Sequence, residues 1–259
     1  MREPRRHFHE QLEDLEAEVQ DMAAAAEDLV ELALDAIGGR DQAVCDRVIA
    51  GDDVIDAYYL AVEQGVMNLF ALQSPVAVDL RLLTALLHIG VHLERTADMA
   101  VTIAKMVKVS WSLPRSQPVV ERLEEMGRLA LQIQAAAMDA LARRDLALCH
   151  ELTVMDEAID RLNRGVLKEI LEVANSRGML EWGMAMHVVA REIERIGDHA
   201  VDIGEQVAFL ISGEFVEFTD ASHPEVEHPE LGIGRAPVLD PGGLPPGVAS
   251  LDRARRRAG

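Results

Sequence analysis

The sequence predicts an all-α protein of two repeated antiparallel three-helix bundles, followed by a disordered C-terminal tail. Apolar residues recur with helical periodicity from near Phe8 to about Ile211, with few and short interruptions. The composition is 49% apolar but only 3% aromatic, and the abundant Ala, Leu, Glu and Arg favour long helices over sheets. In addition, the first half of the helical region resembles the second half in sequence.

Short breaks divide the periodic region into six helices. They fall at Gly38–Asp41, Gln73–Pro75, Ser110–Pro118, Arg143–Asp145 and Asn175–Gly178, and Ser212–Gly213 ends the last helix. We expect Asp41 to cap the second helix, and Ser74 to cap the third with Pro75 at its first position. Each helix should have roughly 25 to 35 residues, or about 40–50 Å at 1.5 Å per residue, and short connections make consecutive helices antiparallel.

The internal repeat sets the predicted domain boundaries. Three pairs of segments match: ALDAIGGRDQAVC (33–45) with AMDALARRDLALC (137–149), DDVID (52–56) with DEAID (156–160), and LERTADMAVTIA (93–104) with IERIGDHAVDIG (193–204). We predict a first bundle at residues 8–112 and a second at 116–213. The repeated cysteines, Cys45 and Cys149, are expected to be small buried hydrophobes without chemistry.

Composition also limits the partners. The net charge of −20 argues against nucleic acids, which need clustered Lys and Arg, and against a bare anionic membrane surface. The N-terminus lacks the apolar core of a signal peptide, and no segment approaches the ~20 apolar residues of a membrane span. We therefore predict a cytoplasmic protein without direct membrane insertion. Residues 219–259, rich in Pro and Gly without a period, are interpreted as a disordered tail.

Paired carboxylates one helical turn apart are candidate metal ligands in both halves. Glu94 and Asp98 interrupt an otherwise apolar stripe, and Glu194 and Asp198 stand at the matching place in the second half. Like charges at this spacing destabilise a helix slightly. Retention of the pair in both halves therefore favours a role in binding a cation. The alternative is a solvated acidic face.

The antiparallel arrangement brings one further carboxylate toward each pair. Asp56 precedes the turn between its two helices by about as many residues as Glu94 follows it, and Asp160 and Glu194 are placed likewise. We expect Asp56 and Asp160 to lie level with these glutamates. Converging carboxylates repel unless a cation or a proton intervenes, and oxygen-rich clusters suit Mg²⁺, Ca²⁺, Mn²⁺ or iron.

The repeated motifs resemble those of the PhoU family, the accessory regulators of phosphate transport. The resemblance covers Phe8 to about Gly213 and is carried by QSPVAVDLR (73–81), LERTAD (93–98) and IERIGDHAVDI (193–203). It implies a cytoplasmic, often homodimeric regulator rather than an enzyme. The implied partners are the ATPase subunit of a phosphate ABC transporter and a sensor histidine kinase, with repression of the phosphate-starvation response when phosphate is plentiful.

The resemblance also implies a cofactor. Some family members bind multinuclear iron or other metals through a Glu/Asp-x-x-x-Asp motif in each bundle. The matching residues are Glu94 and Asp98, and Glu194 and Asp198. The implied cofactor is a metal ion or cluster of iron, manganese or magnesium. The first motif departs from the family pattern, because Ala97 stands where the family more often has Gly.

Two other functions compete with a regulator. A carboxylate-bridged di-metal enzyme usually needs Glu-x-x-His on two helices, and this spacing occurs only at Glu225–His228 in the Pro-rich tail. The remaining alternative is a metal-free helical scaffold. No P-loop, nucleophile elbow or dinucleotide fingerprint is present. The helical histidines are interpreted as packed or solvated side chains: His88, His92, His187 and His199.

Overall fold

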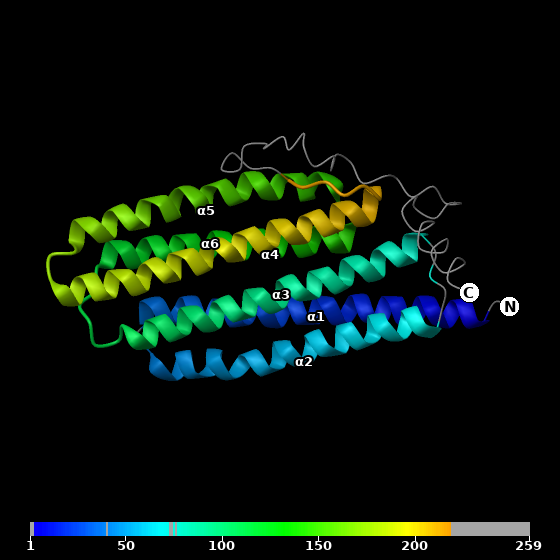
Figure 1. Ribbon diagram of the computed structural model, residues 1–259, viewed down its shortest axis with the longest axis horizontal. Coiled ribbons are helices and arrows are strands. Elements are labelled where there is room, and N and C mark those ends of the chain that lie inside the picture. Colours follow the sequence, from blue (N-terminus) through cyan, green and yellow to red (C-terminus); the bar gives the residue numbers. More distant parts are fainter. Residues whose placement is uncertain (1–2, 40, 73–74, 76, 219–259) are drawn as a thin grey trace, which may run out of the picture. The chain divides into compact units, whose positions relative to one another are not determined.

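The computed structural model describes residues 3–39, 41–72, 75 and 77–218, and this part of the chain contains six helices and no strand (Figure 1). The helices are α1 (Glu3–Gly39), α2 (Gln42–Leu72), α3 (Ala77–Val109), α4 (Gln117–Arg143), α5 (Leu146–Val173) and α6 (Arg177–Ser212). The predicted all-α fold is confirmed. The predicted tail, including Glu225–His228, lies outside the described residues, as does the predicted cap Ser74.

Two helix starts differ from the prediction. Helix α1 begins at Glu3 instead of near Phe8, and its polar first turns contain an exposed ion pair between Arg6 and Glu10, 2.9 Å apart. Apolar periodicity does not detect such a pair, because the residues involved face solvent. Helix α3 begins at Ala77, so Pro75 precedes it instead of occupying its first position.

Side-chain caps fix the starts of several helices. Asp41 accepts a hydrogen bond from the Ala43 backbone N–H at 2.8 Å, which confirms its predicted capping role. Asp145 caps α5 in the same way, and Ser176 caps α6. Helix α4 is closed by Arg144, whose φ of 54° is left-handed and allows its N–H to reach carbonyls of the last turn.

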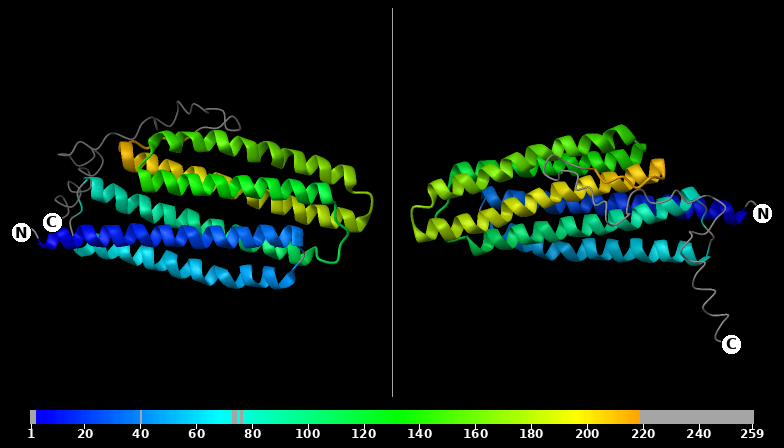
Figure 2. Two further views of the ribbon diagram at one scale, coloured as in Figure 1. Left: turned by 180° about the vertical axis from the view of Figure 1, so that it is seen from behind. Right: turned by 45° about the horizontal axis from the view of Figure 1, so that its top comes forward.

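The six helices form two three-helix bundles that pack against each other. Helices α1, α2 and α3 contact one another, and α6 contacts both α4 and α5, which also contact each other. The bundles meet through α3 with α6 on one side, seen in Figure 1, and through α1 with α4 on the other, seen from behind in Figure 2. One continuous apolar core runs through both bundles. The bundle limits 8–112 and 116–213 stay a prediction.

Both cysteines are fully buried, as the sequence predicts, and neither forms a disulfide. Burial and the neighbouring Asp145 carboxylate raise the pKa of the Cys149 thiol to about 11, and burial also raises the pKa of Cys45. Thiolates therefore do not form at neutral pH. Among the helices of the described residues, none combines the length and the apolar character that a membrane span needs.

Residues beyond α6 fold back onto the second bundle. Gly213, with φ of 76°, ends the helix and turns the chain. Phe215 then stacks on Phe209 with ring centroids 3.8 Å apart. The Phe218 backbone N–H donates a hydrogen bond to Glu205 Oε1 at 2.6 Å. This return contact has no counterpart in the sequence prediction, which ended the fold at Gly213.

Candidate functional site

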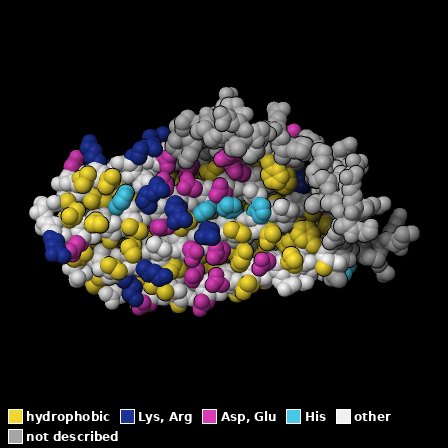
Figure 3. Space-filling model, viewed as in Figure 1, with side chains coloured by type: hydrophobic (Ala, Val, Ile, Leu, Met, Phe, Trp, Pro, Cys, Tyr) yellow, Lys and Arg dark blue, Asp and Glu magenta, His cyan; other side chains and the backbone are white. Residues whose placement is uncertain are grey.

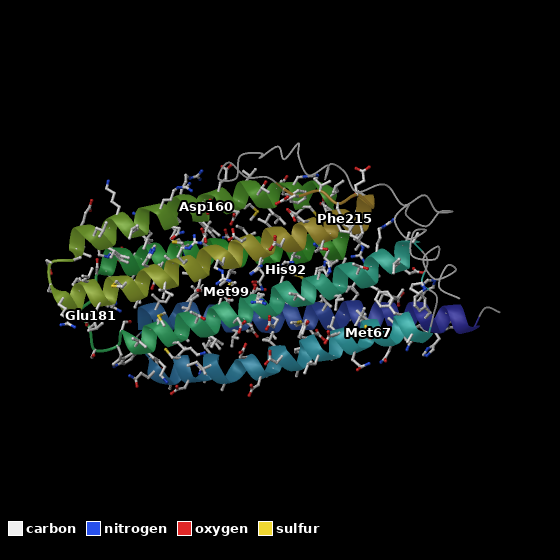
Figure 4. All side chains as sticks on the ribbon, in the orientation of Figure 1. Met67, His92, Met99, Asp160, Glu181 and Phe215 are labelled. Atoms are coloured by element: carbon white, nitrogen blue, oxygen red, sulfur yellow. The ribbon has the colours of Figure 1, made fainter. Side chains whose placement is uncertain are left out.

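One face of the molecule concentrates acidic and histidine side chains. Figure 3 shows a row of histidines along this face, with acidic side chains gathered on both sides of the row. The face is formed by α2, α3, α6 and α5, and Figure 4 places His92 where α3 faces α6 and Asp160 on α5. The candidate site therefore has three parts: an acidic cluster in each bundle and histidines between them.

The first acidic cluster consists of Asp52 and Asp56 on α2 and Glu94 and Asp98 on α3. Burial, followed by repulsion from Asp98, Asp56 and Asp52, raises the pKa of Glu94, although Arg95 opposes the shift. Burial, Asp56 and Asp98 likewise raise the pKa of Asp52. The four carboxylates thus lie within electrostatic reach of one another, at the level that the antiparallel register predicts. Arg95 lies 3.7 Å from Glu94 in its own helix.

The second acidic cluster consists of Asp160 on α5 and Glu194 and Asp198 on α6. Glu194 is only 9% exposed. Its Oε1 atom accepts a hydrogen bond from Asn163 Nδ2 at 3.3 Å and pairs with Arg191, which the sequence argument did not include. Its Oε2 atom is buried and has no hydrogen-bond partner among the described residues.

Electrostatics in the second acidic cluster favours bound protons or cations. Burial, followed by repulsion from Asp198, raises the pKa of Glu194, and the opposing contributions of Arg191 and Asn163 do not cancel this. Desolvation and the charges of Asp160 and Asp202 raise the pKa of Asp198. A carboxylate with a raised pKa is one whose negative charge lacks compensation. A cation beside Glu194 Oε2 would supply that compensation.

The two clusters differ at one packing position, which is glycine in the second bundle and alanine in the first. A Cβ on Gly197 would lie 2.4 Å from Asp156 Oδ1, so glycine at this position lets Asp156 pack directly against α6. Asp156 is accordingly only 4% exposed. In the first bundle Ala97 replaces the glycine, and the matching carboxylate, Asp52, is partly exposed. The departure from the family pattern therefore coincides with a more open first cluster.

The histidines form a polar contact between the bundles that the sequence analysis missed. His92 Nδ1 on α3 lies 3.1 Å from His199 Nδ1 on α6, and both nitrogens approach Asp202 Oδ2, at 3.4 and 3.2 Å. We call these three residues the interbundle triad. Among the described residues, it is the one group of three potential ligand atoms lying within 4.8 Å of one another. The predicted carboxylates are more widely spread.

Electrostatic effects on the interbundle triad are mixed. Burial lowers the pKa of His92, Asp202 raises it, and His199 and His88 lower it further.

One turn along the antiparallel helices, His88 Nδ1 lies 3.1 Å from Gln206 Oε1. The sequence signals for this row are the spacing of four between His88 and His92 and of three between His199 and Asp202. Neither signal shows that the two segments meet.

Comparison with known sequences identifies the family. The sequence pattern of the PhoU domain matches residues 19–107 and 123–207. This chain belongs to the PhoU family. It is 32% identical over 208 residues to the "Phosphate-specific transport system accessory protein PhoU homolog" of Caulobacter vibrioides, covering 80% of this chain and 90% of that protein. Its identity to the accessory protein PhoU of Escherichia coli is 28% over 209 residues, covering 80% and 86% of the two chains.

Solved PhoU structures share the fold. The crystal structure of the phosphate transport system regulatory protein PhoU from Streptococcus pneumoniae matches with a TM-score of 0.74 and 25% identity, over 81% of this chain and 99% of that one. The PhoU structure from Pseudomonas aeruginosa matches with a TM-score of 0.73 and 27% identity, over 80% and 99%. The resemblance drawn from the repeated motifs is thus confirmed, and the six-helix arrangement is that of PhoU proteins.

Proposed function

We propose that this protein is an accessory regulator of phosphate uptake. The observation that carries the proposal is the PhoU-domain match, which extends through both bundles. Relatives that match along most of their length are named accessory proteins of the phosphate-specific transport system. The protein acts by binding partners and not by catalysis.

In this proposal the protein is a cytoplasmic homodimer that couples a phosphate ABC transporter to a sensor histidine kinase. It contacts the transporter's ATPase subunit and represses the phosphate-starvation response when phosphate is plentiful. Its long helices supply extended docking surfaces, and the acidic face suits basic protein surfaces. The net charge of −20 disfavours nucleic acid as a partner.

The regulator can be tested in its host by deleting the gene and following a phosphate-starvation reporter in phosphate-rich medium. We expect the reporter to switch on in the deletion strain and to be repressed again by the complete chain. Purified protein should also retain the ATPase subunit and the kinase on a column. A deletion strain with unchanged reporter and unchanged phosphate uptake would refute the proposal.

We further propose that the two acidic clusters bind metal through Glu94, Asp98, Glu194 and Asp198, with Asp56 and Asp160 contributing. The buried, unpartnered Glu194 Oε2 atom and the raised carboxylate pKa values support this. Iron, manganese and magnesium suit oxygen ligands of this kind. When bound, the metal would neutralise repulsion and fix the face that α2, α3, α5 and α6 present to a partner. The residues themselves position the carboxylates and exclude water from Glu194.

Metal content measured by mass spectrometry tests this second proposal. Protein purified without chelator should carry metal, and the variant Glu94→Gln/Asp98→Asn/Glu194→Gln/Asp198→Asn should lose most of it while remaining helical. A control variant removes four exposed carboxylates outside both clusters: Glu13, Asp14, Glu151 and Glu172. Equal loss of metal from both variants would mean that the overall negative charge, and not these four carboxylates, retains the metal. No metal in the parent after reconstitution would favour the metal-free scaffold.

A further inference from the structure

The contact between α3 and α6 contains three polar atoms whose hydrogen-bonding needs conflict. The triangle of His92 Nδ1, His199 Nδ1 and Asp202 Oδ2 has sides of 3.1, 3.2 and 3.4 Å. An imidazole nitrogen has either one hydrogen or one lone pair, whereas each Nδ1 here has two polar neighbours. With Asp202 ionised, every choice of tautomers for the two histidines therefore leaves two hydrogens, or two lone pairs, facing each other along at least one side of the triangle.

A single cation removes this conflict. Zn²⁺ binds imidazole nitrogen at about 2.0–2.1 Å and carboxylate oxygen at about 2.0–2.2 Å, so tetrahedral angles place neighbouring ligand atoms about 3.3 Å apart. The three sides of the triangle match one face of such a tetrahedron. Two imidazoles and one carboxylate also favour a first-row transition metal over Mg²⁺ or Ca²⁺, which prefer oxygen ligands throughout.

We propose that His92, His199 and Asp202 bind one divalent transition-metal ion such as Zn²⁺. Because its ligands come from both helices, this ion links α3 to α6. The side chains of His92 and His199 are 20% and 19% exposed and that of Asp202 is 41% exposed, so water can complete the fourth position. The site joins one helix of each bundle. It is distinct in its ligands from both acidic clusters, and it does not rest on the regulatory function proposed above.

The surroundings of the triad suit a bound cation. Acidic side chains gather on both sides of the histidine row in Figure 3, and Asp198 lies one residue before His199. The adjoining contact of His88 with Gln206 continues the same antiparallel register, which holds α3 and α6 in place around the triad. The ligands are therefore presented by two packed helices and not by a loop.

Titration of the chelator-stripped, complete protein with Zn²⁺ tests the proposal, and Co²⁺ serves as a coloured probe of tetrahedral geometry. We expect one tight Zn²⁺ equivalent, with visible cobalt bands of a tetrahedral centre. His92→Ala/His199→Ala should weaken binding by at least about 100-fold, because loss of outer-shell partners alone costs 10–100-fold. The matched control is His7→Ala/His9→Ala, which removes two exposed histidines of α1 outside the triad and should leave the zinc affinity unchanged.

Two further variants separate this site from its neighbours. Asp202→Asn preserves side-chain shape and should weaken zinc binding even if the double histidine variant folds poorly. Glu94→Gln/Asp98→Asn/Glu194→Gln/Asp198→Asn should retain the tight zinc equivalent and the cobalt bands. The proposal is overturned if this carboxylate variant loses the tight site while the histidine variants keep it. It is equally overturned if the parent binds no zinc.

Discussion

At the scale of single residues, Gly197 controls the burial of a carboxylate. Its missing side chain leaves the space in which Asp156 Oδ1 lies, and Ile159 Cδ1 would be 3.0 Å from an added Cβ. Because Asp156 is almost fully buried, its carboxylate has little freedom to move aside. One methyl group at this position would therefore disturb the packing of α5 against α6.

We expect Gly197→Ala to lower the free energy of unfolding by about 1–3 kcal/mol through overpacking, measured by urea denaturation. The control is Gly39→Ala, where an added Cβ meets no atom within 4 Å and alanine slightly favours the helix. Equal stability of Gly197→Ala and the parent would show that α5 and α6 separate easily at this level.

Glu205 should make stability depend on pH. Burial raises the pKa of its carboxyl from 4.5 to about 7; the Phe218 N–H opposes this shift, whereas Asp202 and Glu217 add to it. The folded state therefore binds this proton more tightly than the unfolded state. The contribution is fully present below about pH 4.5 and is lost as the pH rises through about 7.

Glu205→Gln removes this titration while its amide oxygen can still accept from Phe218. In chelator-treated protein, the unfolding free energy of the variant relative to the parent should rise between pH 4.5 and 8. The expected rise is about 1–2 kcal/mol, since a pKa unit corresponds to about 1.4 kcal/mol and the carboxylate is only partly buried. A pH-independent difference would mean that Glu205 titrates as an exposed glutamate.

At the scale of helices, the caps show how local sequence fixes an element. Asp145 Oδ1 accepts a hydrogen bond from the Leu148 N–H at 3.1 Å at the start of α5, whereas Ser116 at the start of α4 makes no such side-chain bond. Asp145→Ala should therefore cost about 0.5–2 kcal/mol, and Ser116→Ala much less, in thermal or urea unfolding. Equal losses would assign the effect to helix propensity and not to capping.

The sequence predicted the elements well because their signals are local. Capping residues, glycines and apolar periodicity act within a few positions, so the helices end close to the expected breaks. Two kinds of feature escaped this reasoning. The start of α1 lies in polar turns without apolar periodicity, where Arg6 and Glu10 pair at the surface. The return of the chain to Glu205 depends on a contact between residues 13 apart, beyond the last helix.

The candidate site likewise has one part that the sequence predicted and one part that it did not. Repetition and antiparallel register brought together Asp56 with Glu94 and Asp160 with Glu194, because each pair lies within one bundle. The interbundle triad escaped, since His92 and His199 belong to different bundles and do not occupy matching positions in the repeat. Only the packing of α3 on α6 makes them neighbours. The burial of Glu194 also depended on unpredicted partners, Asn163 and Arg191.

At the scale of the whole molecule, two repeated bundles behave as one body because they share two helix contacts. On the side opposite the histidines, α1 and α4 approach closely at Gly127, where an added Cβ would lie 2.3 Å from Leu34 Cδ2. Glycine at this crossing lets the apolar core continue from one bundle into the other. Tight, extensive packing of this kind favours a single cooperative transition over separate unfolding of two halves.

We expect Gly127→Ala to lower the unfolding free energy by about 1–3 kcal/mol, because the new methyl group collides with Leu34 across the bundle contact. Leu34→Ala alone should cost about 2–5 kcal/mol by leaving a cavity. The double variant should be more stable than the sum of the two losses, since each change fills or opens the same space. Chemical denaturation followed by circular dichroism and by the fluorescence of Trp182, in the second bundle, should give coincident curves when Trp111, the other tryptophan, is replaced by Phe. Additive losses of unfolding free energy would mean that Gly127 and Leu34 are not coupled across the contact between α1 and α4. Denaturation curves that separate would mean that the two bundles unfold independently.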